Sequence, residues 1–179
     1  VLGQCRRGAE RCRDMAREGD LVCVTGNLGD SAAGLRIILD NKPRDTDAAQ
    51  LIEKHYLPMP RVEEGLKLAA TPGVHAMMDI SDGIGSDLRH ILKASGKGAE
   101  IDVKSLPLSV ELKRVCAREG WDPVELATCG GEDYELLFTI TPEAESGLDV
   151  EHHIIGRITS GDSLEWVGSD RDYLGFRHF

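Results

Sequence analysis

The stretch VHAMMDISDGIGSDLRHIL, residues 74–92, decides the fold. It opens with Val74 to Met78, an apolar run of the length of a buried strand. Its later part carries apolar side chains at the spacing of one helix face: Ile84, Leu88, Ile91 and Leu92. We therefore predict a strand that feeds an amphipathic helix through an acidic corner, Asp79 to Gly83.

The acidic corner combines two carboxylates and a hydroxyl, those of Asp79, Asp82 and Ser81. Hard oxygen ligands of this kind suit Mg²⁺. The N–H groups at the start of a helix also attract anions such as phosphate. The corner is thus a candidate site for a metal ion and a phosphate together. The alternative is structural, with Ser81 as the helix cap and Asp82 complementing the helix dipole.

The remaining pattern predicts further strands and helices around this unit. Strands are expected at 21–25, 99–103, 134–140, 153–158 and 163–167, and helices at 32–39, 45–55, 61–70 and 109–118. We expect the last two strands to form a hairpin around Ser160-Gly161-Asp162, and Asp30 or Ser31 to cap the first helix. Because strands and helices do not alternate strictly, we predict an α+β fold in which a mixed sheet packs against helices.

Length and composition limit the class of protein. The chain has 179 residues, enough for one sizeable domain, and a net charge of −10, which argues against a nucleic-acid-binding surface. Its five cysteines are odd in number and lack C-x-x-C spacing, so we predict neither disulfides nor a zinc site, and a cytoplasmic location. No apolar run approaches the roughly 20 residues of a membrane span, and no signal peptide is visible.

Two glycine-rich segments are further candidates. Gly26, Gly29 and Gly34 either let a phosphate approach the backbone or belong to a plain strand-to-helix connection. Gly130-Gly131 precedes Glu132-Asp133-Tyr134, where a carboxylate either faces a ligand or is merely solvated. The six histidines lack the spacing of metal ligands, and none is a credible base.

Three segments together resemble the thiamine-monophosphate kinases. They are Gly26-Asn27-Leu28-Gly29-Asp30-Ser31-Ala32-Ala33-Gly34-Leu35, Met78-Asp79-Ile80-Ser81-Asp82-Gly83 with Asp87-Leu88, and Gly130-Gly131-Glu132-Asp133-Tyr134-Glu135-Leu136. The likeness extends from Gly3 to Phe179 and includes Leu106-Pro107 and the closing Gly-Phe-Arg-His-Phe. It implies the fold of the C-terminal domain of aminoimidazole ribonucleotide synthetase-like proteins.

The resemblance also implies an activity and a set of residue roles. The family transfers the γ-phosphoryl group of ATP, its co-substrate, to thiamine monophosphate. Asp79 and Asp82 match its Mg²⁺ ligands, Ser81 matches an ATP contact, and Arg13 matches an arginine that touches nucleotide phosphate. Glu132 and Phe176 match substrate contacts. The acceptor is an already ionised phosphate oxygen, so no general base is implied.

The resemblance further implies that this chain is a fragment. We expect residues 1–20 to be a lead-in strand and loop from an absent N-terminal domain, and residues 21–179 to be the C-terminal domain. The isolated fragment is expected to be inactive, and the intact enzyme to be a homodimer that binds neither nucleic acid nor membrane. Two alternatives remain, another synthetase of the superfamily or a non-catalytic module that binds thiamine phosphates.

Overall fold

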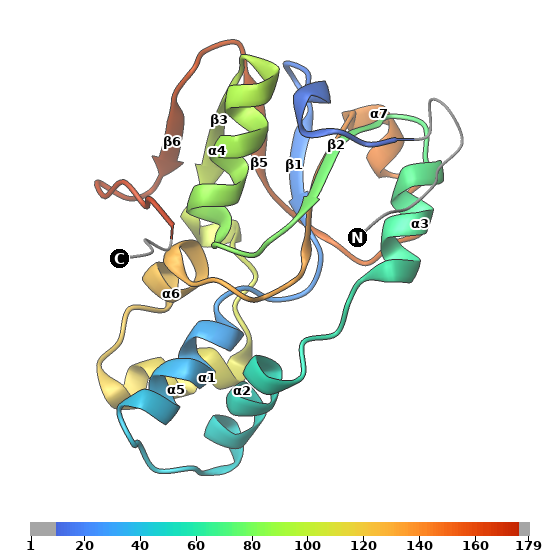
Figure 1. The fold of residues 1–179 in the computed structure, drawn as a ribbon. Helices are drawn as coiled ribbons and strands as arrows, with labels where there is room; N and C mark the ends of the chain where they lie inside the picture. Colours follow the sequence, from blue (N-terminus) through green and yellow to red (C-terminus); the bar gives the residue numbers. More distant parts are fainter. Residues whose placement is uncertain (1–9, 176–179) are drawn as a thin grey trace.

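The computed structural model describes residues 10–175, which form a mixed sheet with helices on both faces and a helical lobe at one end (Figure 1). The strands are β1 (Leu21–Val24), β2 (Val74–Asp79), β3 (Gly98–Asp102), β4 (Leu136–Ile140), β5 (His153–Thr159) and β6 (Leu164–Val167). The helices are α1 (Asp30–Leu39), α2 (Thr46–Tyr56), α3 (Val62–Ala70), α4 (Ile84–Ser95), α5 (Val110–Glu119), α6 (Pro123–Cys129) and α7 (Pro142–Glu145), with 3₁₀ turns η1 (Arg13–Met15) and η2 (Val103–Ser105).

The sheet has the strand order β2-β4-β1-β5-β3-β6. Its pairs are antiparallel except for β3 and β6, which run parallel. The α+β prediction, with a mixed sheet packed against helices, is confirmed. The expected strand and helix of residues 74–92 are present as β2 and α4.

The expected hairpin of the last two strands is wrong, because β3 lies between β5 and β6. The turn that joins these strands instead crosses the start of β3. There the Ala99 N–H donates to the Ser163 carbonyl at 2.9 Å. A Cβ atom on Gly98 would lie 2.6 Å from the same oxygen, so the crossing needs a residue without a side chain. Local turn residues do not reveal such a crossing.

The two faces of the sheet are covered by different helices (Figure 1). Helix α4 packs on one face, where Leu88 and Ile91 meet alternate strand residues such as Leu137. Side chains of the opposite parity, including Phe138, point to the other face and meet Leu68 of α3. The apolar face of α4 therefore packs into the main core. The preceding strand, β2, also contributes to this core.

The helical lobe lies beyond one end of the sheet and consists of α1, α2 and α5 (Figure 1). Its core includes Ile37, Leu51 and Leu112, all fully or almost fully buried. Gly34 of α1 allows close packing, because a Cβ there would lie 2.2 Å from the Leu51 carbonyl oxygen of α2. Gly34 therefore serves helix packing rather than phosphate approach.

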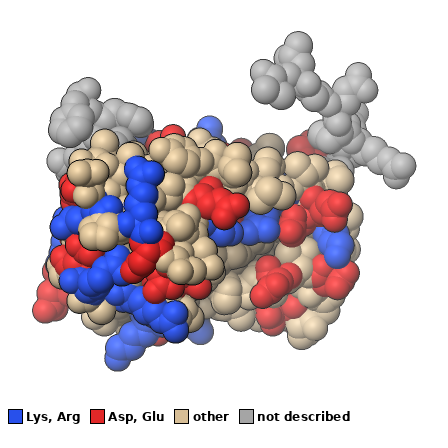
Figure 2. All heavy atoms as spheres, turned by 90° about the horizontal axis from the view of Figure 1, so that it is seen from below, with Lys and Arg blue, Asp and Glu red and all other residues tan. Residues whose placement is uncertain are grey.

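The surface of this lobe carries both signs of charge. In Figure 2, which looks onto the molecule from below, Lys and Arg are interleaved with Asp and Glu. Lys42 and Glu119 are paired at 3.0 Å, and Arg114 and Asp47 at 3.5 Å. Such pairing lowers the positive potential that a basic cluster would otherwise present.

Among residues 10–175, no helix has both the length and the apolar character that crossing a membrane requires.

Replacing Leu88 by Ala tests the role of α4 in the core. Leu88 is fully buried, so its truncation should lower the free energy of unfolding by about 2–5 kcal/mol. Urea unfolding followed by circular dichroism measures the change. Leu66→Ala on α3 is the matched control, because Leu66 is 68% exposed and should change stability by no more than about 0.5 kcal/mol. Equal effects of the two substitutions would contradict this account of the core.

Candidate functional site

The two motifs singled out from the sequence lie against each other in the structure. The Glu132 N–H donates to the Ser81 carbonyl at 2.9 Å, and the Tyr134 N–H donates to the Ile80 carbonyl at 2.9 Å. The Ile80 N–H in turn donates to the Glu135 carbonyl at 2.8 Å. A Cβ on Gly131 would come within 2.4 Å of the Ser81 oxygen, so this glycine is needed for the approach.

The start of α4 is held by one of its own residues. The carboxylate of Asp87 accepts from the N–H groups of Ser81 at 2.9 Å and Asp82 at 3.0 Å. Burial raises the pKa of this carboxyl group, and the two N–H donors oppose that rise. The N-cap is Gly83, so Ser81 is not the helix cap. The N–H groups of Ser81 and Asp82 are bound by Asp87 rather than free for an external anion.

The predicted site residues divide between two grooves. The α1–α6 groove has a volume of about 430 Å³, and its lining includes Ser81, Asp82 and Glu132 together with the apolar side chains Ala32, Leu35, Leu126 and Cys129. The η1–β2 groove, of about 590 Å³, is lined by Arg13 and Asp79 and by Arg11, Cys12, Asp14, Met77, Met78 and Ala94. The loop from Asp79 to Asp82 therefore borders both grooves. Phe176 lies outside the described residues.

Glu132 stands on a strained turn at the edge of the α1–α6 groove. Its φ is 63° and that of Tyr134 is 51°, values that non-glycine residues rarely adopt. Its side chain is 56% exposed, and Oε2 lies 3.8 Å from Nδ1 of His55. His55, which the spacing of the histidines did not indicate, also lines this groove. Only the tertiary fold brings α2 beside the turn.

Asp133 closes the N-terminus of α1 from a distant part of the chain. Its carboxylate accepts from the N–H groups of Gly29 at 2.8 Å and Ser31 at 3.4 Å. The expectation that Asp30 or Ser31 caps this helix is wrong, because the N-cap is Gly29 and makes no side-chain bond. The Asp30 carboxylate instead accepts from the Ser109 hydroxyl at 2.6 Å.

The glycine loop before α1 is thus a packed connection. A Cβ on Gly29 would lie 2.7 Å from the Ala127 backbone nitrogen, and one on Gly26 would overlap the Glu135 carboxylate. The N–H groups that a phosphate would use are already bound by Asp133. Of the two readings of this loop, the structure supports the strand-to-helix connection.

A partly buried ion pair fixes the far end of the second motif. Arg61 donates from Nε and Nη2 to the two carboxylate oxygens of Glu135, at 2.7 and 2.6 Å. The hydroxyl of Thr25 donates to the same carboxylate at 2.7 Å. Bidentate pairs of this kind fix orientation as well as supplying energy. Nothing in the local sequence around Arg61 indicated this partner, which comes from a different element.

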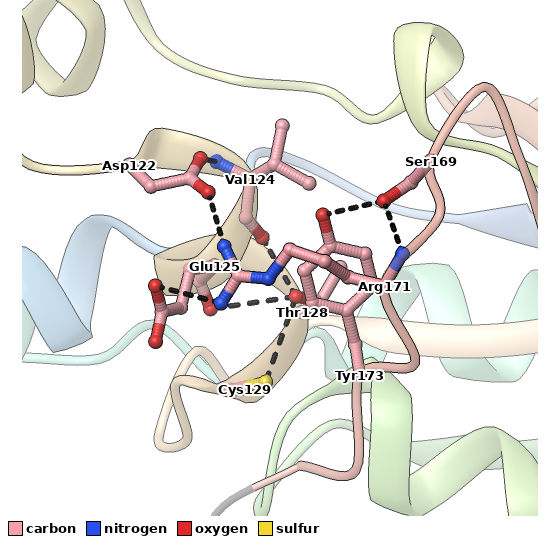
Figure 3. Close-up of polar contacts among 8 residues, drawn as sticks. All are labelled: Asp122, Val124, Glu125, Thr128, Cys129, Ser169, Arg171 and Tyr173. Atoms are coloured by element: carbon pink, nitrogen blue, oxygen red, sulfur yellow. Dashed lines mark hydrogen bonds and ion pairs between the residues drawn. The ribbon is translucent and has the colours of Figure 1, made fainter.

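The segment after β6 is tied to α6 by polar contacts (Figure 3). Arg171 donates to Asp122 at 2.9 Å and pairs with Glu125 at 3.2 Å, and its guanidinium lies over the Tyr173 ring. The Ser169 hydroxyl also contacts the Tyr173 hydroxyl at 3.1 Å. Helix α6 forms one wall of the α1–α6 groove. These contacts therefore link that wall to the segment that follows β6.

Asp79 and Asp82 carry oxygen donors of the kind that Mg²⁺ prefers, and they lie on the loop that borders both grooves. Among the described residues, no group of three or more His, Cys, Asp or Glu side chains is arranged to hold a metal. Mg²⁺ commonly takes only one or two carboxylates and completes its shell with water and phosphate oxygens. Asp79, which is exposed, and Asp82 are donors of that kind.

Comparison with known proteins gives consistent matches. Residues 17–167 match the family model described as AIR synthase related protein, C-terminal domain. The chain is 40% identical over 169 residues to a thiamine-monophosphate kinase of Aquifex aeolicus, covering 93% of this chain and 54% of the relative. It is 43% identical to that of Escherichia coli K12, covering 100% of this chain and 58% of the relative. The chain thus spans about half the length of the curated relatives it matches.

Solved structures also match this chain. The one described as "AaThiL complexed with AMPPCP and TMP" superposes with a TM-score of 0.85 at 39% identity, covering 93% of this chain and 53% of that chain. The hydrogenase maturation protein HypE of E. coli superposes with a TM-score of 0.71 at 20% identity, covering 95% of this chain and 52% of that chain, which shows a shared fold alone.

Asp133 should make stability depend on pH. Burial, together with the neighbouring carboxylates of Asp30 and Glu135, raises its pKa from 3.8 to about 8 against the effect of the N–H donors. Between these values the folded state holds a proton that the unfolded state has lost, so the free energy of unfolding should fall as pH rises. Asp133→Asn removes this titration and should reduce the fall between pH 5 and 8 by an amount on the order of a few kcal/mol.

Urea unfolding at several pH values measures this slope. Asp162→Asn is the control, because Asp162 is exposed and should leave the slope as in the wild type. If Asp133→Asn keeps the wild-type slope, the carboxyl group does not hold its proton as described.

Proposed function

Because this chain belongs to the AIR synthase related protein family, as a C-terminal domain, we propose that it is the C-terminal part of an ATP-dependent kinase that converts thiamine monophosphate to thiamine diphosphate. The observation that carries the proposal is the meeting of Ser81, Asp82 and Glu132 in one groove. The roughly 40% identity with thiamine-monophosphate kinases, and the likeness to a structure holding AMPPCP and TMP, support it. The likeness to HypE concerns the fold alone, so another synthetase activity has less support.

Glu132, Ser81 and the apolar walls of the α1–α6 groove each have a chemical task in this proposal. The carboxylate of Glu132 attracts the cationic thiazolium ring of the substrate, and the hydroxyl of Ser81 contacts ATP. The apolar walls of the groove suit the uncharged part of thiamine. Phosphoryl transfer depends mainly on positioning and charge neutralisation, and the acceptor oxygen is already ionised. No side chain is therefore needed as a general base.

The η1–β2 groove contributes on the other side of the loop from Asp79 to Asp82. Arg13 is exposed there, and its guanidinium contacts nucleotide phosphate in this proposal. Asp79 and Asp82 supply oxygens to Mg²⁺, which when bound neutralises the phosphate charges that the reaction brings together. The family resemblance assigns Phe176, which lies outside the described residues, to packing on the thiamine moiety. These roles follow the family resemblance and the donor chemistry of the residues.

The proposal includes the context of the intact enzyme. Residues 1–20 lead in from a preceding domain, residues 21–179 form the C-terminal domain, and the enzyme is a cytoplasmic homodimer. The chain's coverage of about half of its relatives supports the division. The odd, unpatterned cysteines support the location. A non-catalytic module that binds thiamine phosphates is the rival, and activity measurements distinguish the two.

We expect the 179-residue chain alone to form no measurable thiamine diphosphate from ATP and thiamine monophosphate. Catalysis across a cleft loses its transition-state stabilisation when one wall is missing. Adding the N-terminal half of the A. aeolicus relative should restore product formation, measured by chromatography. Turnover by the chain alone would contradict the division of labour. If the two halves associate with each other but form no thiamine diphosphate, the non-catalytic module is favoured.

Replacing the metal carboxylates tests their assignment. Calorimetric titration with AMPPCP should show tighter binding in the presence of Mg²⁺. Asp79→Asn and Asp82→Asn should each weaken this Mg²⁺-dependent binding by about tenfold or more, because a neutral amide is a poor ligand for a hard cation. The exposed Asp162→Asn is the control. Unchanged Mg²⁺ dependence in both site variants would rule the assignment out.

A further inference from the structure

His55 lies at the end of α2, where its imidazole lines the α1–α6 groove beside Glu132. The side chain is only 15% exposed. Its ring contacts that of Tyr56, with centroids 5.8 Å apart and planes tilted by 47°. The imidazole is therefore confined at the wall of the groove, where a ligand that contacts Glu132 would also approach it.

The orientation of this ring is fixed by α1. Nδ1 of His55 lies 3.0 Å from the hydroxyl of Ser31, within hydrogen-bonding distance. Ser31 is itself held, because its backbone N–H donates to the carboxylate of Asp133. The adjoining residue of the same turn is Glu132, so α1, α2 and the strained turn are joined around one imidazole.

Glu132 needs an orienting partner. Its backbone is held in a left-handed conformation, but its side chain has several rotatable bonds and is more than half exposed. The 3.8 Å separation from Nδ1 exceeds hydrogen-bonding distance, so the contact is electrostatic. The imidazole presents its Nδ1 edge to the carboxylate and so restrains the position of that negative charge. A lysine or arginine in the same place would cancel that charge.

We propose that His55 is a positioning residue that holds the Glu132 carboxylate toward the cationic ring of the substrate, so that the Ser31–His55–Glu132 arrangement sets the preference of the groove for a cationic ligand. This inference rests on the proposed function, since it takes thiamine monophosphate as the ligand. It adds a histidine from α2 and a serine from α1 to the residues that determine specificity.

Calorimetry with two ligands tests the arrangement. One is thiamine monophosphate, and the other is its neutral analogue in which a thiophene ring replaces the thiazolium. The ratio of their dissociation constants reports discrimination by charge, which a purely structural role of His55 would not change. His55→Leu should lower this ratio by about fivefold to tenfold relative to the wild type. His55→Asn keeps an N–H near the position of Nδ1 and should stay within about threefold of it.

Three further variants make the test specific. His153→Leu is the matched control, because His153 is exposed on β5 and should leave the ratio unchanged. In a Glu132→Gln background, His55→Leu should have no further effect on the ratio, since coupled residues are not additive. Ser31→Ala removes the hydroxyl partner and should lower the ratio even if His55→Leu fails to fold.

The outcomes separate this inference from the proposed function. If the wild-type chain binds thiamine monophosphate and His55→Leu or Ser31→Ala keeps the wild-type ratio, the role of His55 is overturned and the proposed function stands. If neither the wild-type chain nor its mixture with the N-terminal half of the A. aeolicus relative binds either ligand, with or without Mg²⁺ and AMPPCP, both are overturned. A ratio that falls in His55→Leu but stays near the wild-type value in His55→Asn supports the positioning role.

Discussion

The candidate site depends on the backbone hydrogen bonds that join residues 80–81 to residues 132–135. They place the two motifs side by side although β4 and β2 are far apart in the sequence. The turn that makes these bonds holds Glu132 and Tyr134 at positive φ, which costs about 1–3 kcal/mol for each residue. The contacts of Asp133 with α1 and of Glu135 with Arg61 offset that cost. This strained turn carries Glu132, whose side chain lines the α1–α6 groove.

Several of the acidic side chains of this protein lie close together beside the candidate site. Asp30, Asp133 and Glu135 are close enough to influence one another, yet each is satisfied by a different device: a serine hydroxyl, a helix N-terminus and an arginine. Buried carboxylates require such partners because an unpaired charge is costly in the interior. Because burial raises the pKa of Asp133 to about 8, this group keeps its proton at neutral pH and adds no negative charge there.

The sequence predicted those features that local patterns encode. The apolar stripe of α4 and the run of β2 are visible within residues 74–92, whereas the meeting of the two motif segments in space appears only in the structure. The features that the sequence did not predict share one cause, because each depends on a partner that is distant in the sequence. Asp133 closes a helix 104 residues away, His55 reaches the groove only through the packing of α2, and β3 separates two strands that a tight turn joins. No window of neighbouring residues contains that information.

The strand order also governs how this chain assembles during synthesis. Of the strands described here, β1 is synthesised first, but its partners in the sheet are β4 and β5, which are synthesised much later. The buried apolar face of Leu21–Val24 must therefore wait, unpaired, until the chain has been translated to about Thr159. Such non-local pairing slows folding and leaves a strand open to aggregation.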